Sequence, residues 1–221
     1  MHYKVVLFDL DGTLLDTLED LANAGNRVLA AQSLPVHPTD AYRYFVGAGI
    51  ATLVERILPP THRQPERIAA TVAEFKREYA ENWHDRTAPY PGIPEMLDQL
   101  VAHGLRLAIL SNKPDDFTRL CVEKLLPRWS FEPIFGQRPG IPPKPDPAAA
   151  LEVAGLLHCS PQEVLYVGDT SIDMRTARAA GMAPVGVLWG FRTADELREA
   201  GAVWLIDQPR ELPAIAAAPS R

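Results

Sequence analysis

The sequence has few cysteines, no excess of positive charge and no long apolar run. Only Cys121 and Cys159 are cysteines among its 221 residues, and they form no pair motif, so neither a disulfide framework nor a zinc site is expected. The 22 Lys and Arg against 28 Asp and Glu give a formal net charge of -6. This balance argues against a broad surface for nucleic acid or anionic membrane, because those partners select for excess positive charge. A small anionic substrate is not excluded, because its binding depends on local charge.

The absence of a long apolar run bears on membrane insertion and export. No segment approaches the roughly 18 apolar residues that a membrane span needs. Residues 1–8 are too short an apolar stretch for a signal peptide, and Asp9 and Asp11 interrupt it at once. We therefore expect a cytoplasmic protein, as the low cysteine content also suggests. The apolar share of 47% and the length suit one large domain or two small ones with a real hydrophobic core.

Apolar runs that alternate with helical patterns predict an α/β fold. Four largely continuous apolar runs are predicted as buried parallel strands, and two weaker ones complete the set: residues 4–8, 105–110, 164–167 and 184–187, then 132–135 and 202–206. Helical periodicity lies between them, at residues 93–103, 115–126, 147–157, 171–180 and 194–200. Strands that alternate with helices indicate βαβ units. We predict a Rossmann-like three-layer sandwich with a mostly parallel sheet.

The alternation fails once, between residues 17 and 88. This stretch has no convincing strand, and its apolar and small residues recur at helical spacing. It is too long for a simple loop. We predict an inserted helical cap, residues 17–88, on an α/β core domain made of residues 1–16 and 89–221. The proline-rich exit at residues 88–92 predicts a stiffened hinge back to the sheet.

The strongest functional signal is Asp9-Leu10-Asp11-Gly12-Thr13, directly after the first predicted strand. In open α/β sheets, ligands bind beyond the carboxyl ends of the strands. Two carboxylates two residues apart can point into one small volume, where they repel each other unless a cation lies between them or one is protonated. Mg²⁺ takes such oxygen ligands, often together with phosphate oxygens of a substrate. The alternative is an ordinary acidic turn.

Three later segments carry polar residues that suit the same site. Ser111-Asn112 follows the strand at 105–110, Lys144 lies among prolines on a stiff backbone, and Asp169 and Asp173 follow the strand at 164–167. Each signal is weak alone, because turns, surface lysines and helix caps explain them singly. Together they indicate one site for a metal and an anion.

These residues give the sequence its resemblance to the haloacid dehalogenase superfamily of phosphotransferases. The four motifs of that family are matched in order over essentially the whole chain: Asp9-x-Asp11-Gly12-Thr13, Ser111, Lys144 and Gly168-Asp169-x-x-x-Asp173. The helical insertion is similar to the small cap of one branch. Within that branch the chain most resembles phosphoglycolate phosphatases, through Asp16-Thr17, Val46-Gly47-Ala48-Gly49, Pro89-Tyr90-Pro91-Gly92 and Gly186-Val187-Leu188-Trp189-Gly190.

The resemblance implies the catalytic and metal-binding residues. Asp9 would be the nucleophile that forms an aspartyl-phosphate, and Asp11 would protonate the leaving group and then deprotonate the attacking water. Mg²⁺ would be held by Asp9, by the backbone carbonyl of Asp11, and by Asp169 directly or through water. Asp173 would act at the outer shell of the metal or orient Lys144.

The resemblance also implies the groups that bind the substrate. Ser111, Lys144 and backbone amides near Gly12 and Asn112 would bind the phosphoryl oxygens, where charge must be stabilised in the transition state. Thr13 would support the two aspartates by hydrogen bonding, with simple capping of the turn as the alternative.

The cap is expected to close over the site and to recognise the leaving group. If the substrate is a small phosphorylated acid, a cation of the cap should face the site. Arg43 is the first candidate and Arg56 the second, and for both the alternative is an ordinary surface arginine.

The resulting hypothesis is a Mg²⁺-dependent phosphomonoester hydrolase for a small phosphorylated metabolite, 2-phosphoglycolate by the finer resemblance. The alternatives are a phosphosugar mutase of the β-phosphoglucomutase type and another small-molecule phosphatase or pyrophosphatase. The second carboxylate, Asp11, disfavours a metal-free dehalogenase. A response-regulator receiver domain also phosphorylates an aspartate beside Mg²⁺ ligands, but it is shorter and lacks such an insertion. The expected partner is a small phosphate ester, and the sequence leaves monomer and homodimer open.

Overall fold

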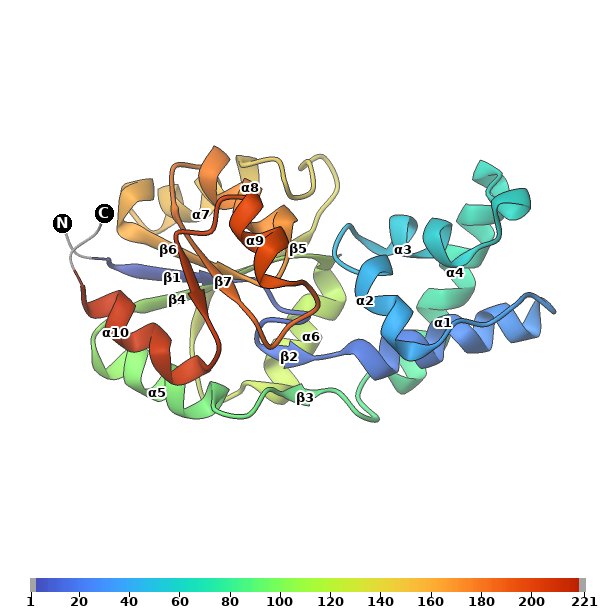
Figure 1. Cartoon of the computed structure of the whole chain (residues 1–221), viewed down its shortest axis with the longest axis horizontal. Coiled ribbons are helices and arrows are strands. Elements are labelled where there is room, and N and C mark those ends of the chain that lie inside the picture. Colours follow the sequence, from blue (N-terminus) through green and yellow to red (C-terminus); the bar gives the residue numbers. More distant parts are fainter. Residues whose placement is uncertain (1–2, 219–221) are drawn as a thin grey trace.

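The structure, a computed structural model, describes residues 3–218, and its centre is a six-stranded sheet (Figure 1). The strand order is β5-β4-β1-β6-β7-β8, and each neighbouring pair is parallel. The strands are β1 (Val5–Phe8), β4 (Arg106–Pro114), β5 (Phe131–Gln137), β6 (Val164–Gly168), β7 (Ala183–Val187) and β8 (Trp204–Ile206). The predicted α/β architecture with a parallel sheet is confirmed.

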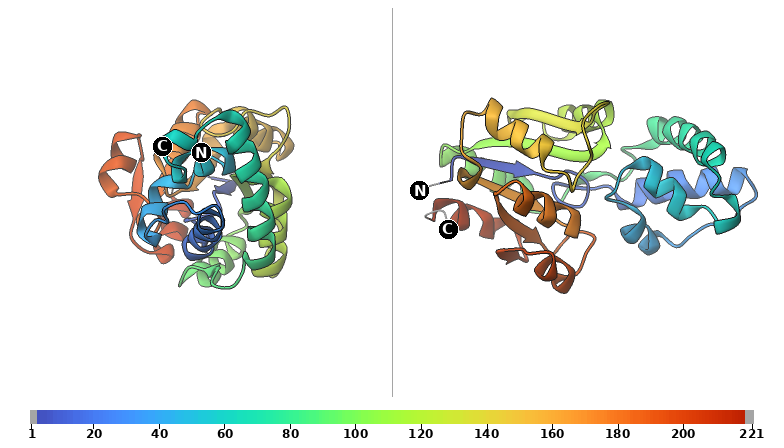
Figure 2. Two further views of the ribbon diagram at one scale, coloured as in Figure 1. Left: turned by 90° about the vertical axis from the view of Figure 1, so that its right-hand side faces the viewer. Right: turned by 90° about the horizontal axis from the view of Figure 1, so that it is seen from above.

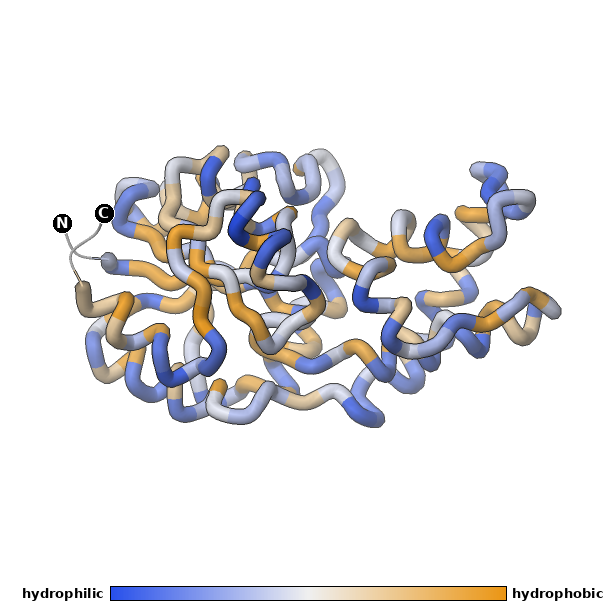
Figure 3. Tube along the Cα trace, in the orientation of Figure 1, coloured by the Kyte–Doolittle hydropathy of each residue, from blue (hydrophilic) through white to orange (hydrophobic). Residues whose placement is uncertain are grey.

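Helices cover both faces of the sheet, because successive side chains of a strand point to opposite faces. Val6 and Phe8 of β1 share a core with α5 (Ile93–Ala102), α6 (Asp115–Leu125) and α10 (Leu212–Ala217). Val5 and Leu7 belong to a second core with α7 (Ala148–Leu156) and α8 (Ser171–Ala179), and α9 (Ala194–Glu199) packs beside α8. This burial on both sides explains why the central strands β1 and β6 are apolar at successive positions. The trace coloured by hydropathy shows the apolar residues gathered in the sheet (Figure 3).

The predicted helical insertion is also present, and it lies beyond the carboxyl end of β1 (Figures 1 and 2). It consists of α1 (Leu18–Ala31), α2 (Tyr42–Phe45), α3 (Ile50–Ile57) and α4 (Pro65–Asn82), of which the short α2 was not predicted separately. Its helices pack through buried side chains that include Leu29, Leu53 and Phe75. Among residues 3–218, no helix combines the length and the apolarity needed to cross a membrane.

A two-stranded antiparallel ladder joins the insertion to the sheet. In this ladder β2 (Leu15–Asp16) pairs with β3 (Ala88–Pro89), so the chain leaves and returns side by side. Asp20 of α1 fastens the returning segment, because its buried carboxylate accepts bonds from the amides of Arg86 and Thr87 and from the Thr87 hydroxyl, at 3.0, 2.8 and 2.7 Å. The ladder lies at the predicted boundaries near residues 17 and 88, and the division into two domains there stays a prediction.

One strand differs from its prediction at a place that matters for function. The strand expected to end at residue 110 continues as β4 to Pro114, so Ser111 and Asn112 belong to the strand and not to a turn after it. The polar run Ser-Asn-Lys-Pro looks like a turn in the sequence, but its first three residues are buried here. They tolerate burial because each polar side chain has a partner within the site. The C-terminal α10, which packs on α5, was not predicted either.

Candidate active site

The topology brings the candidate residues to one crevice at the carboxyl edge of the sheet. The strand order reverses at β1, which lies between β4 and β6, and such a switch point is where open α/β sheets bind ligands. Asp9 directly follows β1, and its amide still donates to the Val167 carbonyl of β6 at 2.9 Å. Asp169 directly follows β6. The shared end of adjacent parallel strands therefore places these two carboxylates beside each other.

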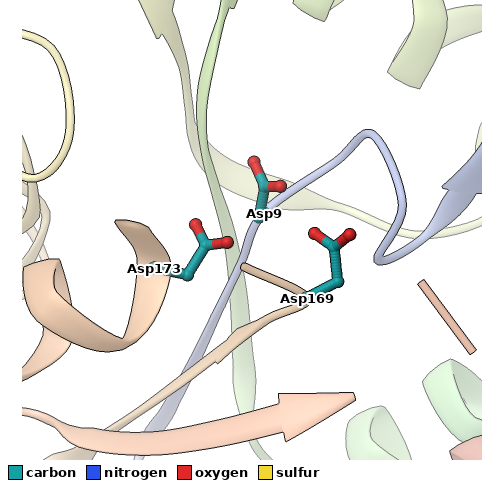
Figure 4. A group of neighbouring side chains, drawn as sticks. All are labelled: Asp9, Asp169 and Asp173. Carbon is teal, nitrogen blue, oxygen red and sulfur yellow. The ribbon is translucent and has the colours of Figure 1, made fainter. Parts of the chain in front are cut away.

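Three buried carboxylates form a cluster at this edge. Asp9, Asp169 and Asp173 each have an oxygen within 4.8 Å of the others, and Figure 4 shows the three carboxyl groups turned toward one small space. Asp173 lies in the first turn of α8, where its carboxylate accepts bonds from the Thr170 amide at 3.1 Å and the Thr170 hydroxyl at 2.6 Å. A capping box thus begins the helix and holds Asp173 at the same time.

Two glycines make room for Asp169. A side-chain carbon on Gly12, whose φ is +88°, would lie 2.3 Å from Asp169 Oδ2, and one on Gly190 would lie 2.3 Å from Asp169 Cβ. The Phe191 amide donates to Asp169 Oδ2 at 2.8 Å, and the Thr13 hydroxyl lies 3.4 Å from Asp169 Oδ1. Thr13 therefore contacts the carboxylate cluster, as a supporting role requires, and that role stays a prediction.

Lys144 enters the cluster from the loop between β5 and α7. Its ammonium group donates to Asp9 Oδ1 at 2.8 Å, to Asp173 Oδ1 at 2.6 Å and to the Leu110 carbonyl at 3.0 Å. Burial by itself lowers the pKa of Lys144, but the Asp173 and Asp9 carboxylates outweigh this and hold the pKa well above its ordinary value. Lys144 is thus a permanent cation between two aspartates, which is the contact that an orienting role for Asp173 needs.

The electrostatics of the cluster fit a hard divalent cation. Burial raises the pKa of Asp9 from 3.8 to about 7, although Lys144 opposes the rise, and burial likewise raises the pKa of Asp169 well above its ordinary value. Three buried carboxylates therefore share one lysine, and all three can be ionised together only beside a further positive charge. Mg²⁺ prefers such oxygen ligands, so the residues present fit the metal that the sequence predicts.

Ser111 and Asn112 occupy the end of β4 beside Lys144. The Asn112 side chain accepts a bond from the Lys144 amide at 2.9 Å and donates to the Lys144 carbonyl at 3.1 Å. It also donates to the Gly47 carbonyl of the helical insertion at 3.0 Å. The Ser111 hydroxyl accepts a weak 3.3 Å bond from the Lys113 amide. Asn112 therefore positions the backbone of Lys144 and links it to the insertion.

Asp11 has a partner that the sequence analysis missed. Its carboxylate pairs with the ammonium group of Lys113 at 3.1 and 3.2 Å, and that ammonium group also donates to the hydroxyl of Tyr79, from α4, at 2.8 Å. Lys113 directly follows Ser111-Asn112, and that adjacency was the only local signal for it. Tyr79 lies in a long helical pattern and has no local signal of function.

A cavity of about 580 Å³, including its open mouth, lies between the sheet edge and the helical insertion. Asp9, Asp11, Ser111, Asn112 and Lys113 line it from the sheet side, and α1, α3, α4 and the loop at residues 46–49 line it from the insertion. The predicted nucleophile and acid therefore face a space that the insertion covers.

The two predicted cations of the insertion lie elsewhere. Arg43 donates to the Gly190 carbonyl at 2.9 Å, and Arg56 donates to the carbonyls of Tyr44 and Phe45 at 3.0 and 3.1 Å. Neither arginine is among the described residues that line the cavity. The structure does not bring Arg43 to the other candidate residues, and its role in substrate binding stays a prediction.

Comparisons with known proteins agree with this geometry. Residues 6–187 match the family model described as haloacid dehalogenase-like hydrolase. The chain is 34% identical to the phosphoglycolate phosphatase of Pseudomonas savastanoi pv. phaseolicola over 95% of its own length and 78% of that protein. It is 32% identical to the phosphoglycolate phosphatase of Haemophilus influenzae strain Rd over 96% of its own length and 97% of that protein.

Solved structures show the same architecture. The crystal structure of a protein from Lactobacillus delbrueckii subsp. bulgaricus is 30% identical, with a TM-score of 0.92 over 99% of this chain and 100% of that one. A predicted phosphoglycolate phosphatase from Haemophilus somnus is 26% identical, with a TM-score of 0.88 over 97% and 98% of the two chains. From the family model, the relatives and the shared architecture it follows that this chain belongs to the haloacid dehalogenase-like hydrolases.

Proposed function

We propose that the protein is a Mg²⁺-dependent phosphomonoester hydrolase that converts 2-phosphoglycolate to glycolate and phosphate. The observation that carries the proposal is the convergence of Asp9, Asp169, Asp173 and Lys144 under the cavity that Asp11 also lines. This set combines a nucleophile, an acid or base and charge-stabilising groups within one covered space.

The metal would be held by Asp9, by the backbone carbonyl of Asp11 and by Asp169, with Asp173 in its outer shell. When bound, Mg²⁺ neutralises charge on the phosphoryl oxygens and on the clustered carboxylates. The raised pKa of both Asp9 and Asp169, which burial causes, supports a cation at this place.

The chain's own residues would carry the reaction in two steps. In the first, a carboxylate oxygen of Asp9 attacks phosphorus, the ester P–O bond breaks, and Asp11 gives its proton to the leaving oxygen. In the second, Asp11 takes a proton from water, the water oxygen bonds to phosphorus, and the bond to Asp9 breaks. Lys144 and Ser111 would bind the phosphoryl oxygens during both transfers.

The helical insertion would act as the cap of this site. We propose that residues 17–88 form a separate cap domain that opens at the β2–β3 ladder and closes to exclude bulk water. Its described contacts with the α/β part include the bonds of Asn112 to the Gly47 carbonyl and of Arg43 to the Gly190 carbonyl. Arg192 of the α/β part also donates to the carbonyls of Arg43 and Val46.

The substrate is proposed from the relatives and from the size of the cavity. Relatives that match nearly the whole chain at 32–34% identity are phosphoglycolate phosphatases. The covered space suits a small ester better than a polymer. We therefore place 2-phosphoglycolate first among small phosphorylated metabolites.

A phosphate-release screen tests the proposal. The protein is incubated with Mg²⁺ and, in separate reactions, 2-phosphoglycolate, sugar phosphates and pyrophosphate, beside Asp9→Asn and an EDTA control. We expect release from 2-phosphoglycolate to be fastest and to be lost in Asp9→Asn and in EDTA. Full activity of Asp9→Asn would refute the nucleophile. Conversion of a sugar 1-phosphate to its isomer without net release would identify a mutase instead.

A further inference from the structure

One cationic side chain that lines the cavity has no role in the proposed reaction. Lys113 is the only Lys, Arg or His among the described residues that line it. Its side chain is 4% exposed, and its ammonium group contacts Asp11 and the Tyr79 hydroxyl. Lys113 is therefore a cationic side chain at the wall of the substrate space.

The wall that the insertion contributes to the cavity is apolar except for one hydroxyl. Its lining side chains are Leu21, Val46, Ile50, Leu53, Phe75 and Tyr79, and only the Tyr79 hydroxyl is polar. A leaving group with several hydroxyls would lose hydrogen bonds to water here without replacement, which is costly. A leaving group with a single anionic end needs only one cationic partner.

The other cations near the site do not line the cavity. The ammonium group of Lys144 bonds to Asp9, Asp173 and the Leu110 carbonyl, and Lys144 is not among the described residues of the lining. Arg43 and Arg56 are bound to backbone carbonyls and do not line the cavity either. An anion on the leaving group therefore finds its cation at Lys113.

The geometry of Tyr79 adds a donor next to that cation. The Tyr79 hydroxyl accepts its bond from Lys113, and among residues 3–218 no bond is formed in which it donates its own proton. Its ring is held in place by Phe75, with centroids 5.8 Å apart, and by Phe117, with centroids 5.3 Å apart. A rigid hydroxyl with an available proton and an ammonium group 2.8 Å away form a two-point site for a carboxylate.

We propose that Lys113 and Tyr79 bind a carboxylate on the leaving group, so that the substrates are phosphate esters of small hydroxy acids and not of sugars or polyols. The inference rests on the proposed phosphomonoesterase function and names the substrate class of that same site. It also assigns a specificity role to a residue of α4, far from the motifs in the sequence. The ammonium group has three N–H donors, and the carboxylate takes the place of one of the two Asp11 oxygens that it contacts at 3.1 and 3.2 Å.

Two esters that differ only in the carboxylate test this proposal. They are 2-phosphoglycolate and 2-hydroxyethyl phosphate, in which a hydroxymethyl group replaces the carboxylate. For each, kcat and KM are measured with Mg²⁺ for the wild type, Lys113→Met and Tyr79→Phe. Tyr42→Phe is the matched control, because Tyr42 is another buried tyrosine of the insertion, and its hydroxyl donates to Asn26 at 3.0 Å instead.

The quantity that decides is the ratio of kcat/KM for the two esters, because Lys113 also pairs with Asp11 and its loss slows both reactions. We expect wild type to prefer 2-phosphoglycolate. The ratio should fall by about 10- to 100-fold in Lys113→Met and by about 5-fold in Tyr79→Phe, mostly through KM, as for the loss of hydrogen bonds to a charged group. It should be unchanged in Tyr42→Phe.

Other results would overturn the proposal in distinct ways. If Lys113→Met slows both esters equally, Lys113 serves only Asp11 and the carboxylate assignment is wrong. If wild type hydrolyses sugar phosphates but neither of these esters, the substrate class is wrong while the phosphatase stands. If no ester releases phosphate, the proposed function itself fails. Should Lys113→Met not fold, as circular dichroism would show, Tyr79→Phe decides by the same ratio.

Discussion

Replacing Lys144 by methionine removes the lysine that contacts Asp9 and Asp173 in the buried carboxylate cluster. The ammonium group lies 2.8 Å from Asp9 and 2.6 Å from Asp173, and the side chain is 2% exposed. Methionine keeps most of the stem and removes the charge. Asp9, Asp169 and Asp173 then face one another without a counterion in the metal-free protein.

The expected cost depends on pH. Breaking a buried ion pair by removing one partner costs about 3–5 kcal/mol. Burial raises the pKa of Asp9 to about 7 in the folded protein, against 3.8 for an unperturbed aspartate, so the folded protein binds its proton more tightly than the unfolded chain. Such a carboxyl lowers the free energy of unfolding as pH rises from about 4 to the folded-state pKa. Without Lys144 that pKa rises further, so the loss extends to higher pH.

Urea unfolding in EDTA at pH 5, 6.5 and 8 measures the effect. We expect Lys144→Met to lose about 3–5 kcal/mol at pH 8 and measurably less at pH 5, where Asp9 is protonated and its share of the ion pairing is already gone. Adding Mg²⁺ at pH 8 should restore part of the loss. Lys4→Met is the control, because Lys4 pairs with Glu163 at 2.7 Å while 56% exposed, and such surface pairs contribute little.

Two results would refute this reasoning. A loss that is the same at pH 5 and pH 8 would mean that Lys144 does not compensate the charge of Asp9. A loss no larger than that of Lys4→Met would mean that the carboxylates have other compensation. Either outcome would also weaken the fit of the cluster to a metal, because that fit depends on uncompensated charge.

Two further substitutions address the hinge and the metal site. Asp20→Ala leaves two amides and a hydroxyl of residues 86–87 without their acceptor. Urea unfolding should show that the free energy of unfolding falls by about 3 kcal/mol. A fall below about 1 kcal/mol would contradict the role of these bonds. Gly190→Ala places a carbon 2.3 Å from Asp169 Cβ and so displaces this carboxylate. Titration calorimetry should therefore show about 10- to 100-fold weaker Mg²⁺ binding. Gly155→Ala is the control and should bind Mg²⁺ like wild type, because its added carbon meets nothing within 4 Å.

Most of the fold was predictable because its signals are local. The apolar runs predicted all six strands of the sheet, since a strand buried on both faces needs apolar side chains at successive positions. The helical insertion was predictable from its length and spacing. The strand β4 was predicted too short, because Ser111, Asn112 and Lys113 are polar, and only their partners in the folded protein make their burial tolerable.

The candidate site was predictable where it depends on strand ends. Asp9 and Asp169 follow neighbouring parallel strands, so the topology alone brings them together. Lys144 is held in a loop, yet its position among prolines marked it. The only local signal for Lys113 is its position after Ser111-Asn112, because its contact with Asp11 joins residues 102 positions apart.

The sequence by itself determined the fold class, the helical insertion and the positions of the carboxylates, because these follow from local periodicity and from the shared edge of parallel strands. Only the tertiary structure decided which cation faces the cavity. The position of α4 beyond the end of β4 brings Tyr79 to Lys113, while Arg43 binds the Gly190 carbonyl and does not line the cavity. Which partner a long side chain reaches depends on how whole helices and strands pack against each other, and no local sequence pattern contains that information.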